Sequence, residues 1–415
     1  MLEFLIGVFT FYTLLKIYIS VMQIGYIADM KKKDAVLLSP AKYQIAANYA
    51  IKKERMVIAE TFIEYILFLF WIYFGLSWLQ NIIGFNNEPY SSIAFVLGYL
   101  AIGYIVSLPF DWYKKFVLDK SFHFSTIDAK TYILDKIKSI IIFAIVGTLL
   151  IYIVSQIITN FDNWWFYSFL IIFLFIIAIN VLYPTFIAPL FNKFKPIEDK
   201  ELRDDIERIL KEVGLNSNGI FTIDASKRDN RLNAYFGGLG KSKRVVLYDT
   251  LLEKLNKNEI LAVLGHELGH YSHKDIIKNI VAMGVFLFIV FFILGHLPQE
   301  LFNQIGIVAN SGAKIVLILI ILPIFSFLYM PIMGLINRHN EYEADKFGAK
   351  IGGKENLING LLKLVNENKA FPYSHPLYIF FYYTHPPIIE RLKALGYDFN
   401  KKSDSIILDF LNANN

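Results

Sequence analysis

The sequence predicts a mainly α, polytopic membrane protein with seven transmembrane helices. Of the 415 residues, 55% are hydrophobic and only 19% are charged, and the mean hydropathy is +0.45. Soluble domains carry about 25% charged residues, so the excess apolar side chains must face lipid. The net charge of +5 is too small and too scattered to indicate a nucleic-acid partner. Membrane lipid is therefore the first partner that we expect.

Seven apolar stretches are long enough to cross a bilayer, which takes about 18 or more residues. The first lacks a basic leader and is too long for a signal peptide, so we expect a retained anchor. Pro184 and Pro189 are expected to kink or end the fifth span. The spans lie near 2–24, 60–83, 91–112, 138–159, 164–190, 276–297 and 314–336.

Lysine and arginine alternate between the loops that join these spans. The loops after the first and third spans and the segment after the fifth are basic. The loops after the second, fourth and sixth spans carry no lysine or arginine up to Lys314. Because cytoplasmic loops are enriched in these residues, the N-terminus is expected outside. The segment 191–275 and the C-terminus are then expected in the cytoplasm.

Two blocks outside the spans have the patterns of folded protein. Residues 198–214 form an amphipathic helical pattern that stops at Gly214. Residues 219–224 and 244–250 have strand patterns, and the segment between them, 235–243, is rich in turn residues. Residues 337–415 have helical patterns that are broken at FPYSHP and THPP.

The motif His266-Glu267-Leu268-Gly269-His270 indicates metal chemistry. On a helix, the two histidines lie one turn apart on one face, so both imidazoles can reach one ion. Glu267 lies beside them, where it can polarise a water molecule at that ion. With eight histidines in the chain, chance would produce this motif in about one such sequence in a hundred. The alternative is a pair of surface histidines beside an ion pair.

A catalytic zinc site needs three protein ligands and one open position. The chain has no cysteine, so the third ligand must be His, Asp or Glu. Glu341 and Asp345 follow the seventh span and lie four residues apart, on one helical face. We predict that Glu341 is the third ligand of one Zn²⁺ per chain. Asp345 is predicted to accept a hydrogen bond from a ligating histidine. A solvated, charged helix is the alternative.

Three neighbouring side chains compete for these roles. Glu343 points to a different face from Glu341. His273 lacks the glycine and the further histidine of the three-histidine zinc pattern. A structural zinc in a non-catalytic channel, transporter or chaperone would need a fourth protein ligand. His339 is the nearest candidate for it, but it stands only two residues before Glu341.

Such a site predicts peptide hydrolysis. Zinc lowers the pKa of a bound water to about 7. Glu267 would take its proton and pass the proton to the leaving amine. The oxyanion that forms needs additional hydrogen-bond donors, and periodicity does not identify them.

The chain resembles the type-I CaaX prenyl endopeptidases, which are integral-membrane zinc metalloproteases of the gluzincin class. The resemblance covers nearly the whole chain and implies a gluzincin-like α+β protease domain. It also implies a peptide or protein substrate, with or without a lipid group, and seven spans that enclose a water-filled chamber. Lys16, Glu64 and Asn180 could line that chamber, or could extend toward an interface instead. The resemblance rests on SKRDNRLNAYFGG, VLGHELGHYSHKD, RHNEYEADKFGAK and FYYTHPPIIERLKAL.

The resemblance also implies roles for single residues. His385 and Arg391 match a pair that stabilises the transition state or holds the substrate carbonyl, since both can donate hydrogen bonds. Without the resemblance they would be a helix start and a surface charge. Residues of an edge strand match the segment that pairs with an extended substrate. The zinc ligands match His266, His270 and Glu341, the general base matches Glu267, and the edge strand matches Asn233, Ala234 and Tyr235.

Four parts of the chain follow from these assignments. Residues 1–190 hold spans one to five with their cytoplasmic loops. Residues 191–275 form a cytoplasmic protease subdomain with the edge strand and the His-Glu-x-x-His helix. Residues 276–336 hold spans six and seven. Residues 337–415 form a cytoplasmic helical part with the third zinc ligand.

The composition and the ending LNANN indicate a bacterial homologue in the inner membrane. Bacteria generally lack protein prenylation, so a farnesylated substrate and a broad role in membrane-protein quality control are equally good hypotheses. A smaller heat-shock type of membrane metalloprotease has the same chemistry, but it lacks the three N-terminal spans.

Overall fold

The computed structural model describes residues 1–84, 87–215, 217–238 and 243–399. Within them, seven helices are long and apolar enough to cross a membrane, so the predicted helical membrane fold is confirmed. The seven are α1 (Leu2–Met30), α2–α3 (Pro40–Phe70, Leu76–Ile83), α4–α5 (Tyr90–Trp112, Asp119–Ser121), α6 (Ala129–Asn160), α7–α8 (Trp164–Leu182, Ala188–Phe191), α12 (Asp275–Gly295) and α14 (Ser311–Gly352).

The outward faces of these helices are apolar. Phe4, Phe11, Ile145 and Phe186 are each at least 66% exposed. A soluble monomer rarely leaves so much contiguous apolar surface in water. We therefore assign these faces to lipid.

Several helices are longer than the spans predicted from hydropathy. The second begins at Pro40, where the Ser39 side chain accepts a hydrogen bond from the backbone of Lys42, although the predicted span begins at 60. Polar residues continue the helix beyond the apolar stretch, because helix formation does not need lipid. Pro184 lies in a π-helical turn (Tyr183–Ile187), and the chain then continues as α8 to Phe191. The proline therefore distorts the fifth helix without ending it.

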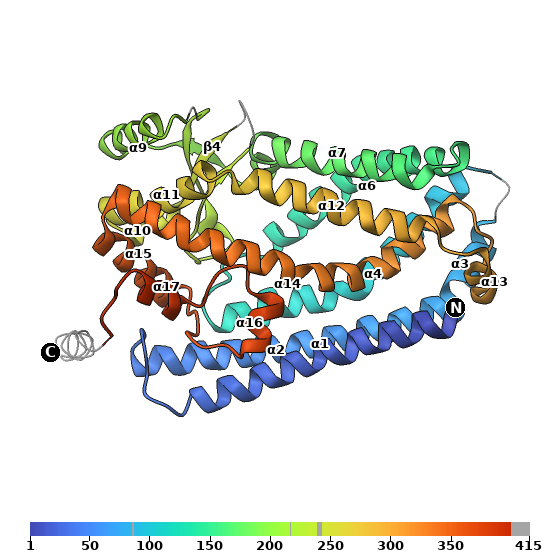
Figure 1. The fold of residues 1–415 in the computed structure, drawn as a ribbon, viewed down its shortest axis with the longest axis horizontal. Coiled ribbons are helices and arrows are strands. Elements are labelled where there is room, and N and C mark those ends of the chain that lie inside the picture. The colour runs from blue at the N-terminus through green and yellow to red at the C-terminus, as the bar shows by residue number, and fades with distance from the viewer. Residues whose placement is uncertain (85–86, 216, 239–242, 400–415) are drawn as a thin grey trace.

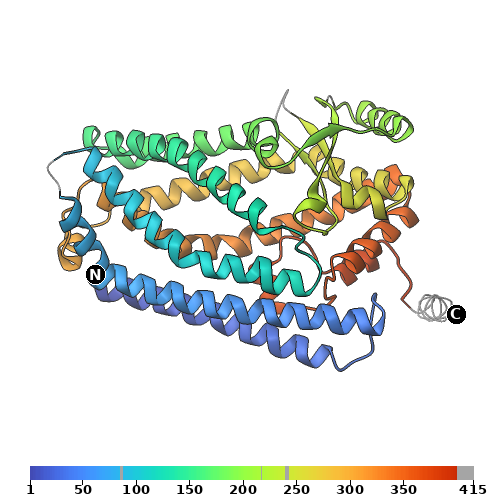
Figure 2. The same cartoon turned by 180° about the vertical axis from the view of Figure 1, so that it is seen from behind.

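The helices run roughly side by side, and the small sheet lies at the end remote from the N-terminus (Figures 1 and 2). The α1–α2 pair lies on one side of the bundle, and α7 packs on α12 on the opposite side. Two cavities of about 280 and 460 Å³ lie among the spans and share Glu64 and Leu67. Lys16 lines the smaller one and lies 3.1 Å from Glu64, whereas Asn180 bonds its own helix at Ile176. A single chamber that joins the cavities stays a prediction.

The soluble part contains a four-stranded sheet with the order β1-β2-β4-β3. Strands β2 and β4 are parallel, and the two outer strands pair antiparallel. The predicted helix is α9 (Lys200–Glu212), and Gly214 follows it at φ +70°. Part of the segment predicted to be turn-rich is strand β3, and its residues 239–242 lie outside the described residues. The strands are β1 (Phe194–Pro196), β2 (Ile220–Ile223), β3 (Ala234–Gly237) and β4 (Arg244–Tyr248).

Short helices complete the fold, both around the sheet and at the opposite end of the bundle. The C-terminal helices break at the two predicted places and also at Gly353, which takes φ +91°. The remaining helices are α10 (Asp249–Lys254), α11 (Lys257–Ser272), α13 (Gln299–Ile305), α15 (Lys354–Glu367), α16 (Pro376–Tyr382) and α17 (Ile388–Ala394).

Candidate active site

The motif helix α11 begins with a reciprocal cap. The Asn256 side chain accepts a hydrogen bond from the backbone of Glu259, and the Glu259 carboxylate accepts one from the backbone of Asn256. This arrangement satisfies two amide groups that a helix start leaves free. Lys363 of α15 lies 2.7 Å from the buried Glu259 carboxylate and neutralises it. The helix that carries the histidines is therefore fixed at its first turn.

Glycines let α11 and the long helix α14 approach each other closely. A Cβ atom at Gly269 would lie 2.8 Å from the Cα atom of Ala344, and one at Gly348 would lie 2.8 Å from the backbone nitrogen of His266. Neither distance is possible for a real side chain, so only glycine fits there. The crossing brings the start of the soluble part of α14 to the histidine face of α11. The glycines at this crossing are Gly265, Gly269, Gly348 and Gly352.

The predicted ligands meet at this crossing. The ligand atoms of His266, His270 and Glu341 all lie within 4.8 Å of one another. Glu341 Oε1 is 3.1 Å from His270 Nε2, and Oε2 is 3.5 Å from His266 Nε2. The Glu341 side chain is 4% exposed, and its Oε2 atom receives no hydrogen bond from any described residue.

These features fit a zinc ion. Two imidazole nitrogens and one carboxylate oxygen are a donor set that zinc accepts. A buried carboxylate oxygen without a hydrogen bond is costly unless a cation compensates it, and Arg391, the cation 3.3 Å from Glu341 Oε2, is shared with Asp345. The residues present therefore suit a metal ion, and His266, His270 and Glu341 are the residues that would hold it.

Each histidine is oriented by a carboxylate on its other ring nitrogen. Asp345 Oδ1 lies 2.9 Å from His266 Nδ1. Asp275 Oδ2 lies 3.1 Å from His270 Nδ1, and Lys278 lies 2.8 Å from the same carboxylate. Such contacts fix the tautomer and the ring plane of a ligand.

Asp275 was not predicted from the sequence. It is the first residue of α12, and the chain reaches it through Lys274, which takes the left-handed conformation at φ 58°. That turn brings an aspartate five residues after His270 back against the histidine. Only the spacing could have signalled it.

Arg391 of α17 lies inside the site. It is 8% exposed, and its Nε and Nη2 atoms lie 2.8 and 2.7 Å from the two Asp345 oxygens. Its Nη1 atom lies 3.3 Å from Glu341 Oε2. The burial excludes the alternative of a surface charge. A planar guanidinium suits this two-point contact with a carboxylate.

His385 approaches the same carboxylate from the open side. Its Nε2 atom lies 3.2 Å from Glu341 Oε1, its side chain is 63% exposed, and Thr384 Oγ1 lies 3.0 Å from its Nδ1 atom. The two ring nitrogens of His385 therefore contact Glu341 on one side and the Thr384 hydroxyl on the other.

Burial and charge shift several pKa values here, among them those of Glu267 and His270. Burial raises the pKa of Glu267 above its ordinary value, although the neighbouring imidazoles of His266 and His270 oppose this. Burial lowers the pKa of His270, but the carboxylates of Glu341 and Asp275 outweigh it and raise the pKa to about 9. A carboxylate whose pKa is raised toward neutrality is a stronger base than an ordinary one.

The competing side chains lie outside the ligand group. Glu343 is paired at 2.7 Å with Lys346, and both are exposed. His273 caps the end of α11 with its ring 6.1 Å from the Phe347 ring, and His339 is exposed. In the described part of the chain, the group of metal-ligating side chains contains neither histidine.

The predicted edge strand is at the edge of the sheet. Strand β3 pairs only with β4 among the described strands, and the Asn233 carbonyl accepts a hydrogen bond from Tyr248. Because antiparallel residues alternate, the backbone groups of Ala234 face the free side. There the Asn233 side chain accepts a hydrogen bond from the Ala234 amide at 2.9 Å. Such an edge can add an extended peptide as a new strand.

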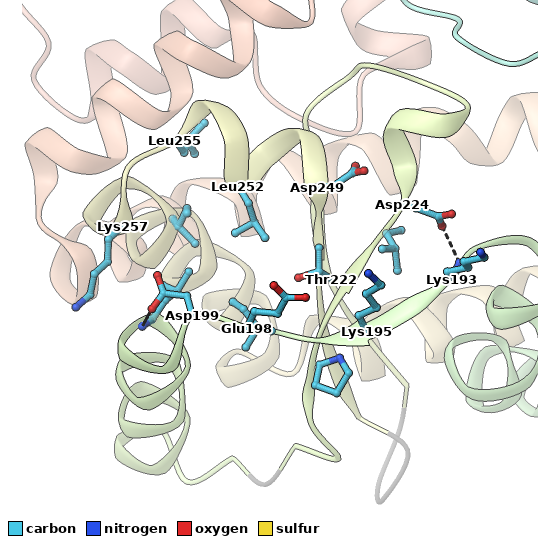
Figure 3. A pocket seen from close by; sticks show the side chains of 15 residues that line it. Lys193, Lys195, Glu198, Asp199, Thr222, Asp224, Asp249, Leu252, Leu255 and Lys257 are labelled. Atoms are coloured by element: carbon cyan, nitrogen blue, oxygen red, sulfur yellow. Dashed lines mark hydrogen bonds between the residues drawn. The ribbon is translucent and has the colours of Figure 1, made fainter.

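A cavity of about 580 Å³ lies elsewhere and is lined from β1, β2, α9, α10 and the first turn of α11, as Figure 3 shows. Lys193 donates its backbone N–H to Asp224 at its rim. None of the predicted site residues lines this cavity.

Comparison with known proteins gives family models for both parts of the chain. The model "Peptidase family M48" matches residues 196–398. The model "CAAX prenyl protease N-terminal, five membrane helices" matches residues 30–193. Together they cover most of the chain.

Similar proteins match over most of their lengths. CAAX prenyl protease 1 of Saccharomyces cerevisiae is 32% identical over 88% of this chain and 85% of its own length. The Dictyostelium discoideum homolog is 34% identical over 75% of each chain. The crystal structure of S. mikatae Ste24p superposes with a TM-score of 0.88 and 28% identity, covering 95% of this chain and 98% of that one.

Gly269→Ala is expected to push α11 away from α14. Overpacking a tight contact costs about 1–3 kcal/mol, and here it also separates Glu341 from the histidines. We expect a lower melting temperature and less bound metal, measured by thermal unfolding and by elemental analysis. Gly25→Ala is the control, because a Cβ atom there meets nothing within 4 Å. Full metal content in Gly269→Ala would contradict this account of the crossing.

Proposed function

The chain belongs to peptidase family M48, and from this premise we propose a zinc-dependent endopeptidase that acts at the cytoplasmic face of its membrane. The family, together with the seven apolar helices, makes it an integral multi-pass membrane metalloendopeptidase. The finer proposal rests on one observation above all. The ligand atoms of His266, His270 and Glu341 converge, with Glu267 in the same turn of α11.

Glu267 is proposed as the general base. A zinc ion, when bound, supplies Lewis acidity that makes water more acidic and a carbonyl carbon more electrophilic. Glu267 takes a proton from the attacking water and gives it to the leaving amine nitrogen. Its raised pKa suits both steps, because the carboxylate is a better base and then holds the proton until the amine departs.

The remaining polar residues are proposed in two roles. His385 has an exposed ring beside Glu341 and can donate a hydrogen bond to the oxyanion that forms on the substrate. Arg391 is held by both oxygens of Asp345, so its contacts favour fixing Asp345 and Glu341 over direct contact with substrate. Asp345 and Asp275 then orient the two histidines.

The substrate is proposed to be a peptide in extended conformation along β3. Asn233, Ala234 and Tyr235 supply that edge, and main-chain pairing accepts many sequences. The similar proteins are named CAAX prenyl proteases, which favours a substrate with a lipid-modified C-terminal region. Broad cleavage of membrane-associated or misfolded peptides is the second candidate, because main-chain pairing is independent of sequence.

Two alternative functional hypotheses have less support. A structural zinc needs a closed fourth position, and among the described residues the ligand group has three members. The smaller heat-shock type of metalloprotease lacks the three N-terminal spans, whereas the described residues here hold seven helices long and apolar enough to cross a membrane, and the chain matches the CAAX N-terminal family model.

The orientation and source are also proposals. The distribution of lysine and arginine supports an external N-terminus and a cytoplasmic active site. The composition supports a bacterial inner membrane, although the similar proteins named above come from eukaryotes.

Glu267→Gln is expected to keep the metal but to lower kcat at least about a thousandfold, because general-base catalysis is lost. His266→Ala is expected to lose the metal itself. Cleavage of a quenched fluorescent peptide and elemental analysis of the purified protein measure both effects. Glu343→Gln is the matched control, since this exposed carboxylate lies outside the ligand group. Normal cleavage by Glu267→Gln would refute the enzymatic mechanism.

Prenylation of a CAAX-type peptide is expected to increase kcat/KM at least about tenfold, because burial of about two CH₂ groups of the lipid already provides that factor. The same peptide with and without its prenyl group is compared by mass spectrometry of the products. Equal rates, with cuts at several positions, would favour the quality-control function instead.

The absence of cysteine permits a direct test of orientation. Single cysteines placed at Asn163 and at Lys33 are expected to react differently with a membrane-impermeant maleimide added to intact cells. Asn163→Cys lies in the loop between α6 and α7 and should be labelled from outside. Lys33→Cys should be labelled only after the membrane is opened. The reverse pattern would overturn the proposed topology.

A further inference from the structure

The segment that leads into strand β3 is tied to the membrane helices. Arg231 of this segment lies three residues before Ala234. Its Nη2 atom lies 3.1 Å from Asp119 and 2.8 Å from the Tyr49 hydroxyl. Its guanidinium also covers the Phe124 ring at 4.2 Å. Asp119 and Tyr49 belong to α5 and α2, so one side chain joins the soluble domain to two spans.

The Asp119 carboxylate needs the positive charge of Arg231. It is fully buried, the Tyr49 hydroxyl donates to its Oδ1 atom at 2.8 Å, and its Oδ2 atom has no hydrogen-bond partner among the described residues. A buried carboxylate is costly without an opposite charge nearby. Arg231 supplies that charge, so its position is fixed more tightly than that of an ordinary surface arginine.

Two further contacts hold the same segment. Arg228 forms a two-point ion pair with Asp135 of α6, at 2.8 and 3.1 Å. Asn368, at the end of α15, accepts a hydrogen bond from the Leu232 amide at 2.8 Å and donates one to the Leu232 carbonyl at 3.2 Å. The backbone just before Asn233 is therefore held on several sides.

The exposed edge lies directly beyond these contacts. Asn233 is exposed, and the backbone groups of Ala234, whose amide donates to the Asn233 side chain, begin the edge that pairs with no other strand in the described sheet. A shift of the chain at Arg231 would move these groups relative to α11 and the metal ligands. Strand pairing needs donor and acceptor placed to within a few tenths of an ångström.

We propose that Arg231 and Asp119 are positioning residues that set where the substrate-pairing edge of β3 lies, and so set the affinity for the substrate backbone. The proposal rests on the proposed function, since it presumes that substrate pairs with β3. It places part of the control of substrate binding in the membrane helices α2 and α5, away from the metal site.

The test uses a peptide substrate and analogues that are N-methylated at one backbone nitrogen at a time. N-methylation removes one donor and is expected to raise the KM of the parent enzyme about tenfold at the position that pairs with β3. Arg231→Met alone leaves a buried carboxylate without its partner, so Arg231→Met/Asp119→Asn is measured with it. Arg231→Lys keeps the charge but cannot reach all partners. Arg208→Met is the control, because Arg208 pairs with Asp205 on an exposed face of α9.

In the double variant we expect an unchanged metal content, a KM raised about tenfold and a kcat within about threefold of the parent. The penalty for N-methylation should fall to about twofold or less, since pairing is already impaired. Arg231→Lys should be intermediate, and Arg208→Met should match the parent.

A full tenfold N-methylation penalty in the double variant, or an unchanged KM, would overturn the positioning role. A purely structural role would lower the melting temperature and leave that penalty unchanged. If N-methylation at no position affects the parent enzyme, then the proposed strand pairing is itself wrong, which separates the two failures.

Discussion

The close crossing of α11 and α14 is the contact on which the rest of the site depends. The histidines lie on one helix, and Glu341 lies on another that first crosses the membrane. Their ligand atoms meet because Gly269 and Gly348 leave no side chain between the two backbones. Helices with larger residues there would stay about 8–10 Å apart at their axes, and a carboxylate would no longer reach both imidazoles.

Charge pairing also stabilises the site formed at the crossing of α11 and α14. Three carboxylates, Glu341, Asp345 and Asp275, surround two histidines in a mostly buried space. Arg391 and Lys278 offset part of this negative charge, and a bound cation would offset more. Buried charges persist only when they are paired. A bound metal and Arg391 would therefore offset the same negative charge, so binding of a metal would also stabilise the folded site.

The contacts predicted from the sequence are those between residues one helical turn apart. The spacing of His266 and His270, and of Glu341 and Asp345, follows from one helical turn. Asp275 was missed because its role depends on the left-handed turn at Lys274, and the burial of Arg391 depends on how α17 docks. The pairing of Lys16 with Glu64 joins two spans. Hydropathy did not predict that the helix of the second span begins at Pro40, because polar residues can extend a helix beyond its apolar stretch.

The helices assigned to the membrane also contribute residues to the predicted metal site. Helix α14 contains both a span and Glu341, α12 begins at Asp275, and Arg231 is neutralised by Asp119 at the end of the third span. A soluble fragment from 196 to 274 would keep the histidines, yet it would lose every carboxylate that orients them and the buried partner of Arg231. Because those carboxylates lie at the ends of membrane helices, the geometry of the site is set by how the bundle packs. The packing of the membrane helices therefore sets the arrangement of the predicted metal ligands.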